Sequence, residues 1–377
     1  MSVRPFQFHT TPAIVFGEGE SARLAAHASA LGPRVLLVTD PGIRAAGLAE
    51  RAVASFAPSS VVTVEDGVGP DPSLAMVRNA VSRALEIGAT GIVGLGGGSS
   101  LDVAKVVALL AGSGEDVDGA WGVGNARGPR LPLALVPTTA GTGSEVTPVS
   151  IVTVGETEKR GISSPLLLPD VAVLDPELTH GLPPEVTAAT GIDAMVHAIE
   201  AYASRNANNN PVSRTLAVEA LRLLARHIED AVEGRREARA PMLLGSMLAG
   251  QAFANSPVAA VHALAYPLGG IFKVPHGLSN AVLLPYVLAF NADDPGAARA
   301  YSELAPLLGA RGSDGFIDRL GEIAEACGIR GGMGALGVRE EHLDRMAADA
   351  MKQTRLLVNN PREVTEADAR AIYEAAL

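Results

Sequence analysis

The sequence predicts a chain in two parts, an α/β domain with a parallel sheet over residues 1–182 and an all-helical domain over residues 183–377. In the first part, short β-branched runs alternate with longer helical patterns, whereas the patterns of the second part are mostly helical. The two parts meet near the segment THGLPPE, where Pro183 and Pro184 favour a helix start or a linker.

The apolar runs of the first part lack a regular polar alternation, which indicates strands that are buried on both faces, as in a parallel sheet. The predicted strands are 35–39, 61–64, 91–95, 133–136 and 171–174, with helices over 73–87 and 100–111 between them. In the second part we expect further helices over 298–308, 316–326 and 340–352.

The composition excludes several classes of protein. Hydrophobic residues make up 47% of the 377 residues, which is enough for a large core, and the net charge of −11 argues against a nucleic-acid or acidic membrane surface. Cys327 is the single cysteine, so an internal disulfide is impossible, and we expect a buried thiol. Neither a signal peptide nor a run of membrane-spanning length is visible, so we expect a cytoplasmic protein.

The segment GLGGGSSLDVAK, at 94–105, follows a predicted strand and opens a helical pattern. Glycines 96–98 let the backbone approach a ligand, and the N–H groups of the following helix attract phosphate. We expect Ser99 or Ser100 to cap this helix, with Asp102 in its first turn. Since the last glycine of the usual dinucleotide fingerprint is absent, the segment predicts either a pyrophosphate cradle or a tight turn before a capped helix.

A second polar loop, VPTTAGTGSEVT at 136–147, also follows a predicted strand. Its hydroxyl groups either satisfy the backbone of the loop itself or contact a nucleotide. Because the carboxyl ends of parallel strands meet at one edge of a sheet, the two loops together predict a ligand crevice at that edge.

Three charged residues of the first part have two interpretations each. Asp40 ends a predicted strand, where a carboxylate either binds the adenosine ribose and repels a 2′-phosphate, or forms an Asx turn with Pro41 and Gly42. Lys105 and Lys159 contact phosphate or ribose, or they are surface charges, and for Lys105 we favour a charge on a solvated helix face.

One carboxylate and three imidazoles in the second part form a candidate metal site. Asp193 and His197 are four residues apart in a helical pattern, so their side chains share one face. His262 and His276 lie among apolar and small residues, where an unpaired imidazole would be poorly solvated. This set suits Fe²⁺, Zn²⁺ or Mn²⁺ and does not select among them.

Together these segments resemble the iron-containing (group III) alcohol dehydrogenase family over essentially the whole chain. The matching segments include VTDPG, GGGSSLDVAK, PTTAGTGSE, ATGIDAMVHAIEAY and HALAYPLGGIFKVPHG. The resemblance implies a Rossmann-like first domain and a helical second domain in a dehydroquinate synthase-like layout, with the active site in the cleft between them. It also implies that Asp193, His197, His262 and His276 hold one metal ion.

The resemblance further implies that NAD binds the two polar loops and that the metal is Fe²⁺, with Zn²⁺ as the alternative. The implied cofactor contacts are Asp40, Asp71, Gly97, Gly98, Ser99, Asp102, Thr138, Thr139, Thr142 and Lys159. Asp71 stands where many relatives carry Asn.

The implied catalytic residues are His276 and Tyr266, which stands one turn after His262, where many relatives have a second histidine near the substrate. A tyrosine, with an ordinary pKa near about 10, is a poorer base at neutral pH, so the proton path and the alcohol stay open. Phe253 is interpreted either as a wall of the substrate pocket or as an ordinary core aromatic.

We therefore expect a metal- and NAD-dependent dehydrogenase that interconverts a small alcohol and its aldehyde or ketone, assembled as a homodimer or larger homo-oligomer. The alternative is a sugar-phosphate cyclase of dehydroquinate synthase type, which uses NAD and a metal without net oxidation. A phosphorylated substrate needs several basic side chains, and Lys273 is the only one between His262 and His276. A nucleotide-binding protein without turnover fits the complete ligand set poorly.

Overall fold

The structure is a computed structural model that describes residues 4–56, 58, 60–155 and 158–377. The chain divides into an N-terminal unit, His9–Gly181, and a C-terminal unit, Leu182–Leu377, which residues 4–8 join. The expected boundary after residue 182 lies one residue from this division. The prediction places residues 4–8 in the first domain, but Gln7 exchanges two hydrogen bonds with Asn208 of the C-terminal unit, each 2.9 Å long.

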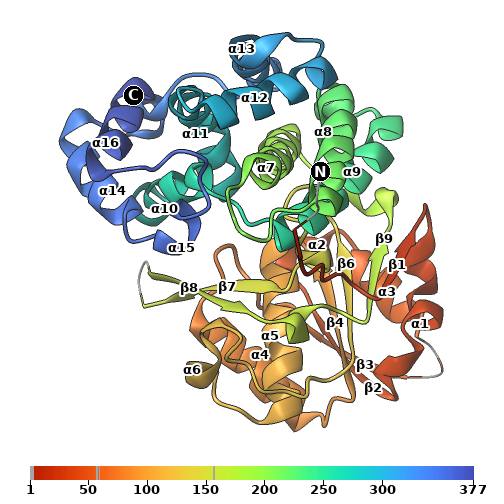
Figure 1. Cartoon of the computed structure of the whole chain (residues 1–377). Coiled ribbons are helices and arrows are strands. Elements are labelled where there is room, and N and C mark those ends of the chain that lie inside the picture. The colour runs from red at the N-terminus through yellow and green to blue at the C-terminus, as the bar shows by residue number, and fades with distance from the viewer. Residues whose placement is uncertain (1–3, 57, 59, 156–157) are drawn as a thin grey trace. The chain divides into compact units, whose positions relative to one another are not determined.

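A six-stranded parallel sheet forms the centre of the N-terminal unit (Figure 1), with the strand order β1-β9-β6-β4-β2-β3. Its strands are β1 (Ala13–Phe16), β2 (Arg34–Val38), β3 (Val61–Glu65), β4 (Gly91–Gly96), β6 (Leu133–Pro137) and β9 (Val171–Leu174). The α/β class and the five predicted strands are confirmed, each to within one residue at either end. Strand β1 was not predicted.

A smaller sheet in the same unit was also not predicted from the sequence. It contains β5 (Gly122–Val123), β8 (Glu158–Ser163) and β7 (Val149–Val154), in that order, with β7 and β8 antiparallel. The helices of the unit are α1 (Leu24–His27), α2 (Pro41–Ala45), α3 (Leu48–Ala54), α4 (Leu74–Glu86), α5 (Gly98–Ser113) and α6 (Val117–Ala120). Short 3-10 turns occur at Glu20–Arg23, Ser29–Leu31, Ser144–Val146, Pro165–Leu167 and Pro176–Thr179.

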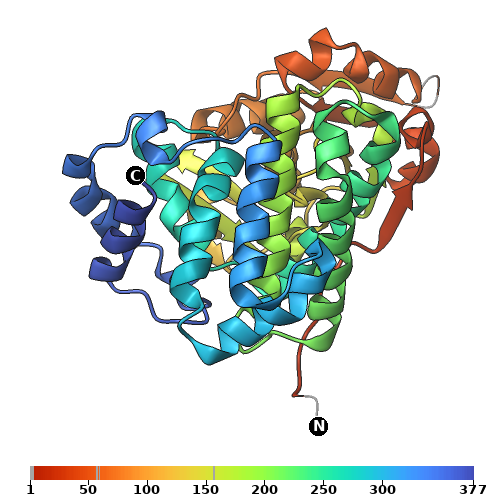
Figure 2. The ribbon, with the colours of Figure 1, turned by 90° about the horizontal axis from the view of Figure 1, so that it is seen from above.

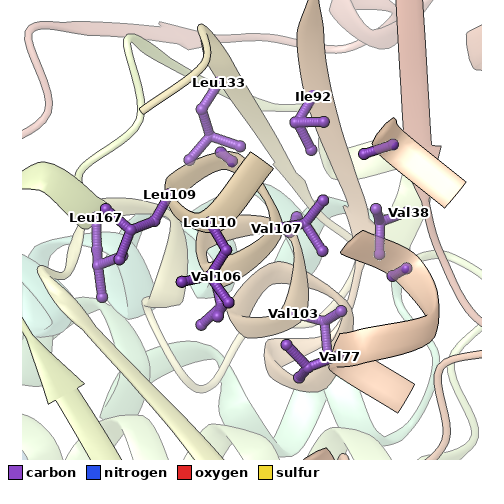
Figure 3. Close-up of a cluster of buried hydrophobic side chains, with 14 of the residues drawn as sticks. Val38, Val77, Ile92, Val103, Val106, Val107, Leu109, Leu110, Leu133 and Leu167 are labelled. Carbon is purple, nitrogen blue, oxygen red and sulfur yellow. The ribbon is translucent and has the colours of Figure 1, made fainter. Parts of the chain in front are cut away.

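Helix α5 is the central helix of this unit, and apolar side chains surround it (Figure 3). Val103, Val107 and Leu110 are buried together with Ile92 of β4 and Leu133 of β6. A helix that is apolar on all sides is stable only inside a core. This burial fixes the N-terminus of α5 at the edge of the sheet where β4 ends.

The chain reverses its direction across the sheet between β2 and β4. After β2 it adds β3 on one side, and it then returns to add β4, β6 and β9 on the other side. In open parallel sheets, ligands bind outside the carboxyl ends of the strands at such a reversal. Asp40 follows β2 and Gly97 follows β4, so two predicted cofactor residues lie at this point.

The C-terminal unit is helical throughout, because residues 182–377 are all described and contain no strand. Its helices are α7 (Pro184–Ala203), α8 (Pro211–Val232), α9 (Arg239–Asn255), α10 (Ala260–Phe272), α11 (His276–Asn291), α12 (Pro295–Leu304), α13 (Gly312–Ala326), α14 (Leu343–Ala350), α15 (Thr354–Leu357) and α16 (Glu366–Ala375). Short 3-10 turns occur at Arg236–Ala238, Ala305–Leu308, Met333–Leu336 and Glu340–His342. Of the two interpretations of Pro183 and Pro184, a helix start or a linker, the helix start is the one observed, because α7 begins at Pro184. The expected burial of Cys327 is confirmed.

Helix α7 is the centre of this unit and packs against α8, α9 and α11. Figure 2 shows the long helices of the unit side by side. Every residue of α7 from Gly191 to Tyr202 is buried, including polar ones, so its polar side chains must find partners inside the unit. Among the described residues, none of the helices combines the length and the apolar character needed to cross a membrane.

Candidate active site

Helix α7 carries three buried polar residues at positions that share one face. Asp193, His197 and Glu200 follow one another at spacings of four and three, and each is at most 5% exposed. Burying such groups is unfavourable unless each finds a hydrogen bond, an ion or an opposite charge. The contacts of this face therefore define the candidate site.

Three of the four predicted metal ligands converge. Oδ1 of Asp193 lies 3.8 Å from Nε2 of His262 and 3.8 Å from Nε2 of His276. All three ligand atoms lie within 4.8 Å of one another. Two atoms that each lie about 2 Å from one ion are at most about 4 Å apart, so small shifts of the side chains suffice for a shared ion.

His197 lies beside this group. Its ring stacks on the ring of His262, with centroids 4.8 Å apart, and on the ring of Phe253 from α9, at 4.3 Å. The predicted role of His197 as a fourth ligand stays a prediction. Phe253 therefore contacts a predicted metal ligand.

His276 is the accessible member of the group. Its side chain is 43% exposed, whereas those of Asp193 and His262 are at most 5% exposed. His276 is the first residue of α11, and the ring of Tyr266 from α10 lies 6.3 Å from its ring. The two predicted catalytic residues are therefore near each other, on the accessible side of the group.

The group fits a divalent metal ion. Nε2 of His262 is buried and has no hydrogen-bond partner among the described residues, an arrangement that is costly unless another atom binds there. Nδ2 of Asn280 donates to Oδ1 of Asp193 at 2.6 Å and lies 3.2 Å from Nε2 of His276. The amide thus directs its partial positive charge at two of the atoms that a metal ion would use.

Two residues that contact the predicted ligands were not predicted from the sequence. Glu200 lies 2.6 Å from Nδ1 of His262, and Asn280 bonds to Asp193. The signal was present, because Glu200 continues the helical spacing from Asp193 and His197, and Asn280 lies one turn after His276. Spacing alone does not separate such residues from ordinary members of a buried helix face.

The charges in the group support each other. Burial alone would raise the pKa of Asp193, but the three histidines and the hydrogen bond from Asn280 outweigh it and hold that pKa below its ordinary value. Burial alone would lower the pKa of His262, but the charge and hydrogen bond of Glu200 outweigh it and raise that pKa. The site therefore favours an ionised Asp193.

The start of helix α5 has no side-chain cap. Its N-cap residue is Gly97, and the prediction that Ser99 or Ser100 caps the helix was wrong. The helix begins earlier than expected, at Gly98, so both serines lie inside its first turn, and the Ser100 hydroxyl lies 3.4 Å from Oδ2 of Asp40. An uncapped helix start after a glycine turn offers its N–H groups to an anion such as a phosphate.

The second polar loop packs against this helix start. The backbone N–H of Thr138 donates to the carbonyl of Gly96 at 3.0 Å. A Cβ added to Gly98 would lie 2.8 Å from Cγ2 of Thr142, and a Cβ added to Gly97 would lie 3.6 Å from Thr139. The structure therefore brings together the predicted cofactor residues of both loops and explains the need for glycine at position 98.

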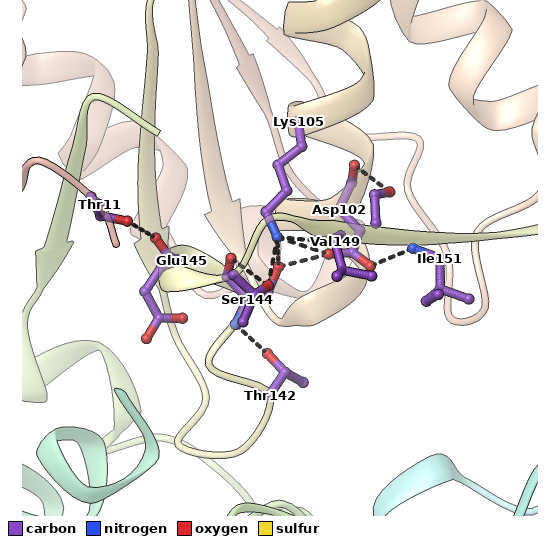
Figure 4. Close-up of polar contacts among 10 residues, drawn as sticks. Thr11, Asp102, Lys105, Thr142, Ser144, Glu145, Val149 and Ile151 are labelled. Atoms are coloured by element: carbon purple, nitrogen blue, oxygen red, sulfur yellow. Dashed lines mark hydrogen bonds and ion pairs between the residues drawn. The ribbon is translucent and has the colours of Figure 1, made fainter. Parts of the chain in front are cut away.

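Lys105 is fully buried, so its interpretation as a solvated surface charge was wrong. Its ammonium group donates to Ser144 Oγ at 2.7 Å, to Thr147 Oγ1 at 3.1 Å and to the carbonyl of Val149 at 2.8 Å (Figure 4). Burial lowers its pKa, against the opposing charge of Asp102. The sequence does not indicate this burial, because the two hydroxyl partners of Lys105, on Ser144 and Thr147, lie about forty residues away along the chain.

Asp102, a predicted cofactor contact, belongs to the same polar cluster. Its carboxylate accepts hydrogen bonds from Ser144 Oγ at 2.6 Å and from the backbone N–H of Ile151 at 2.9 Å. Asp102 and Lys105 thereby join α5 to the loop after β6 and to β7. A contact between Asp102 and the cofactor stays a prediction.

The remaining predicted cofactor residues form two arrangements. Oδ1 of Asp40 accepts a hydrogen bond from the N–H of Ile43 and caps α2, which is the Asx-turn interpretation, while Oδ2 faces Ser100. Lys159 lies 2.5 Å from Oδ1 of Asp71 and donates to Thr153 at 2.9 Å. Asp71 has a left-handed backbone, with φ of 51°.

Comparison with known protein families gives two matches that divide the chain as the structure does. Residues 11–176 match the iron-containing alcohol dehydrogenase family. Residues 187–377 match the C-terminal domain of the Fe-containing alcohol dehydrogenase family.

Similar proteins cover nearly the full chain. A long-chain-alcohol dehydrogenase from Geobacillus thermodenitrificans is 41% identical, over 96% of this chain and 94% of that protein. The crystal structure of a 1,3-propanediol oxidoreductase superimposes with a TM-score of 0.94 at 34% identity, over 99% of this chain and 100% of the other. A sulfoacetaldehyde reductase from Bifidobacterium kashiwanohense, solved with NAD⁺, gives 0.90 at 29% identity, over 99% of each chain.

Proposed function

This chain belongs to the iron-containing alcohol dehydrogenase family and is a metal-dependent alcohol dehydrogenase, and we propose that it uses NAD and Fe²⁺ to interconvert a small alcohol and its aldehyde or ketone. The observation that carries the proposal is the convergence of Asp193 and His276 on Nε2 of His262, a buried nitrogen that has no hydrogen-bond partner among the described residues.

The proposed ligands of the metal are Asp193, His197, His262 and His276. A divalent ion bound there supplies Lewis acidity, which lowers the pKa of an alcohol and stabilises its alkoxide. The protein contributes one buried negative charge, from Asp193, and neutral imidazole nitrogens, and helices α7, α10 and α11 position these groups. Fe²⁺ is proposed from the family, and Zn²⁺ is the alternative that a metal analysis would identify.

The proposed cofactor is NAD, which supplies the hydride acceptor. The uncapped start of α5 and the adjoining glycines fit its pyrophosphate. The carboxylate of Asp40 at the reversal point of the sheet favours a free ribose 2′-hydroxyl over a 2′-phosphate. A similar structure was solved with NAD⁺, which supports the same choice here.

Tyr266 is proposed to orient the substrate oxygen, since it lies beside the accessible ligand His276. One hydrogen bond to a reacting oxygen contributes about 1–1.5 kcal/mol, so Tyr266→Phe should lower kcat/KM about tenfold. Full activity of that variant would show that the hydroxyl does not touch the reacting atoms. The relatives named above include a long-chain-alcohol dehydrogenase and a 1,3-propanediol oxidoreductase. The preferred substrate size is therefore found by measuring kcat/KM for alcohols and diols of increasing chain length.

The direct test is an anaerobic purification with Fe²⁺, followed by addition of NAD⁺ and primary alcohols or diols. We expect the absorbance band of NADH to appear, and we expect it to be lost in the double variant H262A/H276A. Activity in the double variant would rule out the metal site. Turnover of a phosphorylated polyol without net NADH would instead favour the cyclase, and binding of NAD without any turnover would favour a nucleotide-binding protein.

Two further properties stay predictions of the sequence, assembly as a homodimer or larger homo-oligomer and a cytoplasmic location. Light scattering of the purified protein measures the first. A mass of one chain, 38.6 kDa, would contradict it.

A further inference from the structure

The carboxylate of Glu200 has three neighbouring hydrogen-bond donors, and all of them belong to one short segment. Oε2 accepts from the backbone N–H of Ala259 at 2.9 Å and lies 2.6 Å from Nδ1 of His262. Oε1 accepts from the N–H of Val261 at 2.7 Å. Glu200 is 5% exposed, so water contributes little to its solvation.

These contacts define the start of helix α10. Ala259 is the N-cap residue of that helix and offers no side-chain cap, so its N–H and that of Val261 need an acceptor from elsewhere. Glu200 supplies it from α7, and its negative charge also suits the positive end of the helix dipole. One side chain of α7 thus fixes both the backbone just before His262 and the imidazole itself.

The same contact selects the tautomer of His262. A carboxylate only accepts hydrogen bonds, so the nitrogen facing Glu200, Nδ1, must carry a hydrogen. In the neutral ring, Nε2 then keeps its lone pair. This is the buried nitrogen that has no hydrogen-bond partner within the described part of the chain, and it lies 3.8 Å from Oδ1 of Asp193.

We propose that Glu200 is a positioning residue that holds His262 in the Nδ1–H tautomer and thereby sets the affinity of the site for its metal ion. The inference rests on the proposed metal site and adds to it a carboxylate–histidine pair. Partners of this kind orient the ring and raise the basicity of the coordinating nitrogen, and their removal costs about 10–100-fold in metal affinity.

The competing interpretation is that Glu200 only caps α10. Asp175 provides a matched control for it, because it is a fully buried carboxylate that also accepts several hydrogen bonds, from the N–H groups of Gly19, Ser21 and Glu177 and the hydroxyl of Ser21. Asp175 belongs to the N-terminal unit and faces no histidine in these contacts. Asp175→Asn therefore reports the general cost of neutralising a buried capping carboxylate.

The experiment compares metal-free wild type, Glu200→Gln and Asp175→Asn. A glutamine keeps the shape but directs an NH₂ group at one of the three donors, so it cannot accept from all of them. In competition with a chelator, Glu200→Gln should bind Zn²⁺ and Fe²⁺ about 10–100-fold more weakly than wild type, and Asp175→Asn should bind them as wild type does. Equal affinity in wild type and Glu200→Gln would overturn the proposal.

A second measurement uses wild type and therefore does not depend on whether a Glu200 variant folds. In metal-free wild type labelled with ¹⁵N-histidine, the His262 signal is assigned by its loss in His262→Asn. The spectra are recorded over a pH series and compared where the ring is neutral, because a protonated ring carries hydrogen on both nitrogens. In the neutral ring we expect hydrogen on Nδ1 and none on Nε2, and a neutral ring with its hydrogen on Nε2 would overturn the proposal. If wild type binds no metal at all, the proposed function fails, whereas metal binding without an effect of Glu200 leaves that function intact and removes only this inference.

Discussion

Gly277 lies directly against Ala189 of helix α7. A Cβ added to Gly277 would be 2.5 Å from the carbonyl oxygen of Ala189 and 3.4 Å from Cβ of Asp193. Because His276 is the preceding residue, this close approach of α11 to α7 brings its imidazole beside Asp193. Glycine at position 277 is therefore a condition for the metal site and not only for the fold.

We expect Gly277→Ala to lower the free energy of unfolding by about 1–3 kcal/mol, because the new methyl group meets backbone that cannot rotate away. It should also weaken binding of Zn²⁺ by the metal-free protein, since His276 moves away from Asp193. Denaturant unfolding and chelator competition measure the two effects. Gly321→Ala on α13 is the control, because its added Cβ would meet no atom of another described segment within 4 Å. Unchanged metal affinity in Gly277→Ala would contradict the close approach as a condition for the site.

Lys105→Met should destabilise the N-terminal unit and weaken NAD binding. Methionine fills the volume of the buried stem but leaves Ser144, Thr147 and the carbonyl of Val149 without their charged donor. Hydrogen bonds to charged groups contribute about 1.5–3 kcal/mol each, so we expect a loss of at least that size in the free energy of unfolding. Thermal unfolding and titration of NAD⁺ by fluorescence give the two values.

Lys352→Met is the matched control for that variant. Lys352 also pairs with an aspartate three residues away, Asp349, but its side chain is 72% exposed, so the change should stay within about 0.5 kcal/mol. If Lys105→Met behaved like Lys352→Met, the buried cluster would contribute little to the cofactor loop.

The sequence was sufficient for those parts of the protein that depend on local patterns. Buried β-branched runs predicted five of the six strands of the main sheet. The strand that was not predicted, β1, is a four-residue edge strand without a buried residue. The helical spacing of Asp193 and His197 predicted a shared polar face. The convergence with His262 and His276 followed from family resemblance, since no local rule brings three helices together.

The sequence was insufficient where a side chain finds its partner in a distant segment. The sequence predicts a surface charge at Lys105 because the acceptors that bury it come from the loop and strand after β6. The prediction of a serine as the N-cap residue of α5 was wrong because the helix starts where Gly98 packs against Thr142, before either serine. Glu200 has a helical position that any buried residue could occupy, and only the contact with His262 distinguishes it.

The stability of the protein should depend on pH through Glu145, which is buried. Burial raises its pKa from 4.5 to about 7, against the opposing effects of its own backbone N–H and of Lys105. Between pH 4.5 and about pH 7, Glu145 keeps its proton in the folded protein but has lost it in the unfolded chain. The stability that Glu145 contributes is therefore fully present below about pH 4.5 and is lost as the pH rises through about 7.

The variant Glu145→Gln, which cannot ionise, should lack this dependence. A rise in pKa from 4.5 to about 7 corresponds to a loss of roughly 3 kcal/mol in the free energy of unfolding of wild type as the pH rises. Between pH 5 and pH 8, the free energy of unfolding of the variant should therefore increase by about that amount relative to wild type. Urea unfolding of both proteins at several pH values measures the difference. Parallel stability curves over that range would mean that Glu145 ionises as freely in the folded protein as in the unfolded chain.

Asp40 caps α2 and is proposed to favour NAD over NADP, and its replacement by serine separates these two roles. Asp40→Ser keeps an oxygen that can accept from the N–H of Ile43 and cap α2, but it removes the negative charge at the reversal point of the sheet. The ratio of kcat/KM for NADP⁺ to that for NAD⁺ should therefore rise tenfold or more, which corresponds to about 1.4 kcal/mol. Asp116→Ser changes a capping carboxylate at the start of α6 in the same way and should leave the ratio unchanged. A wild-type preference for NADP⁺, or an unchanged ratio in Asp40→Ser, would show that Asp40 acts only as the cap of α2.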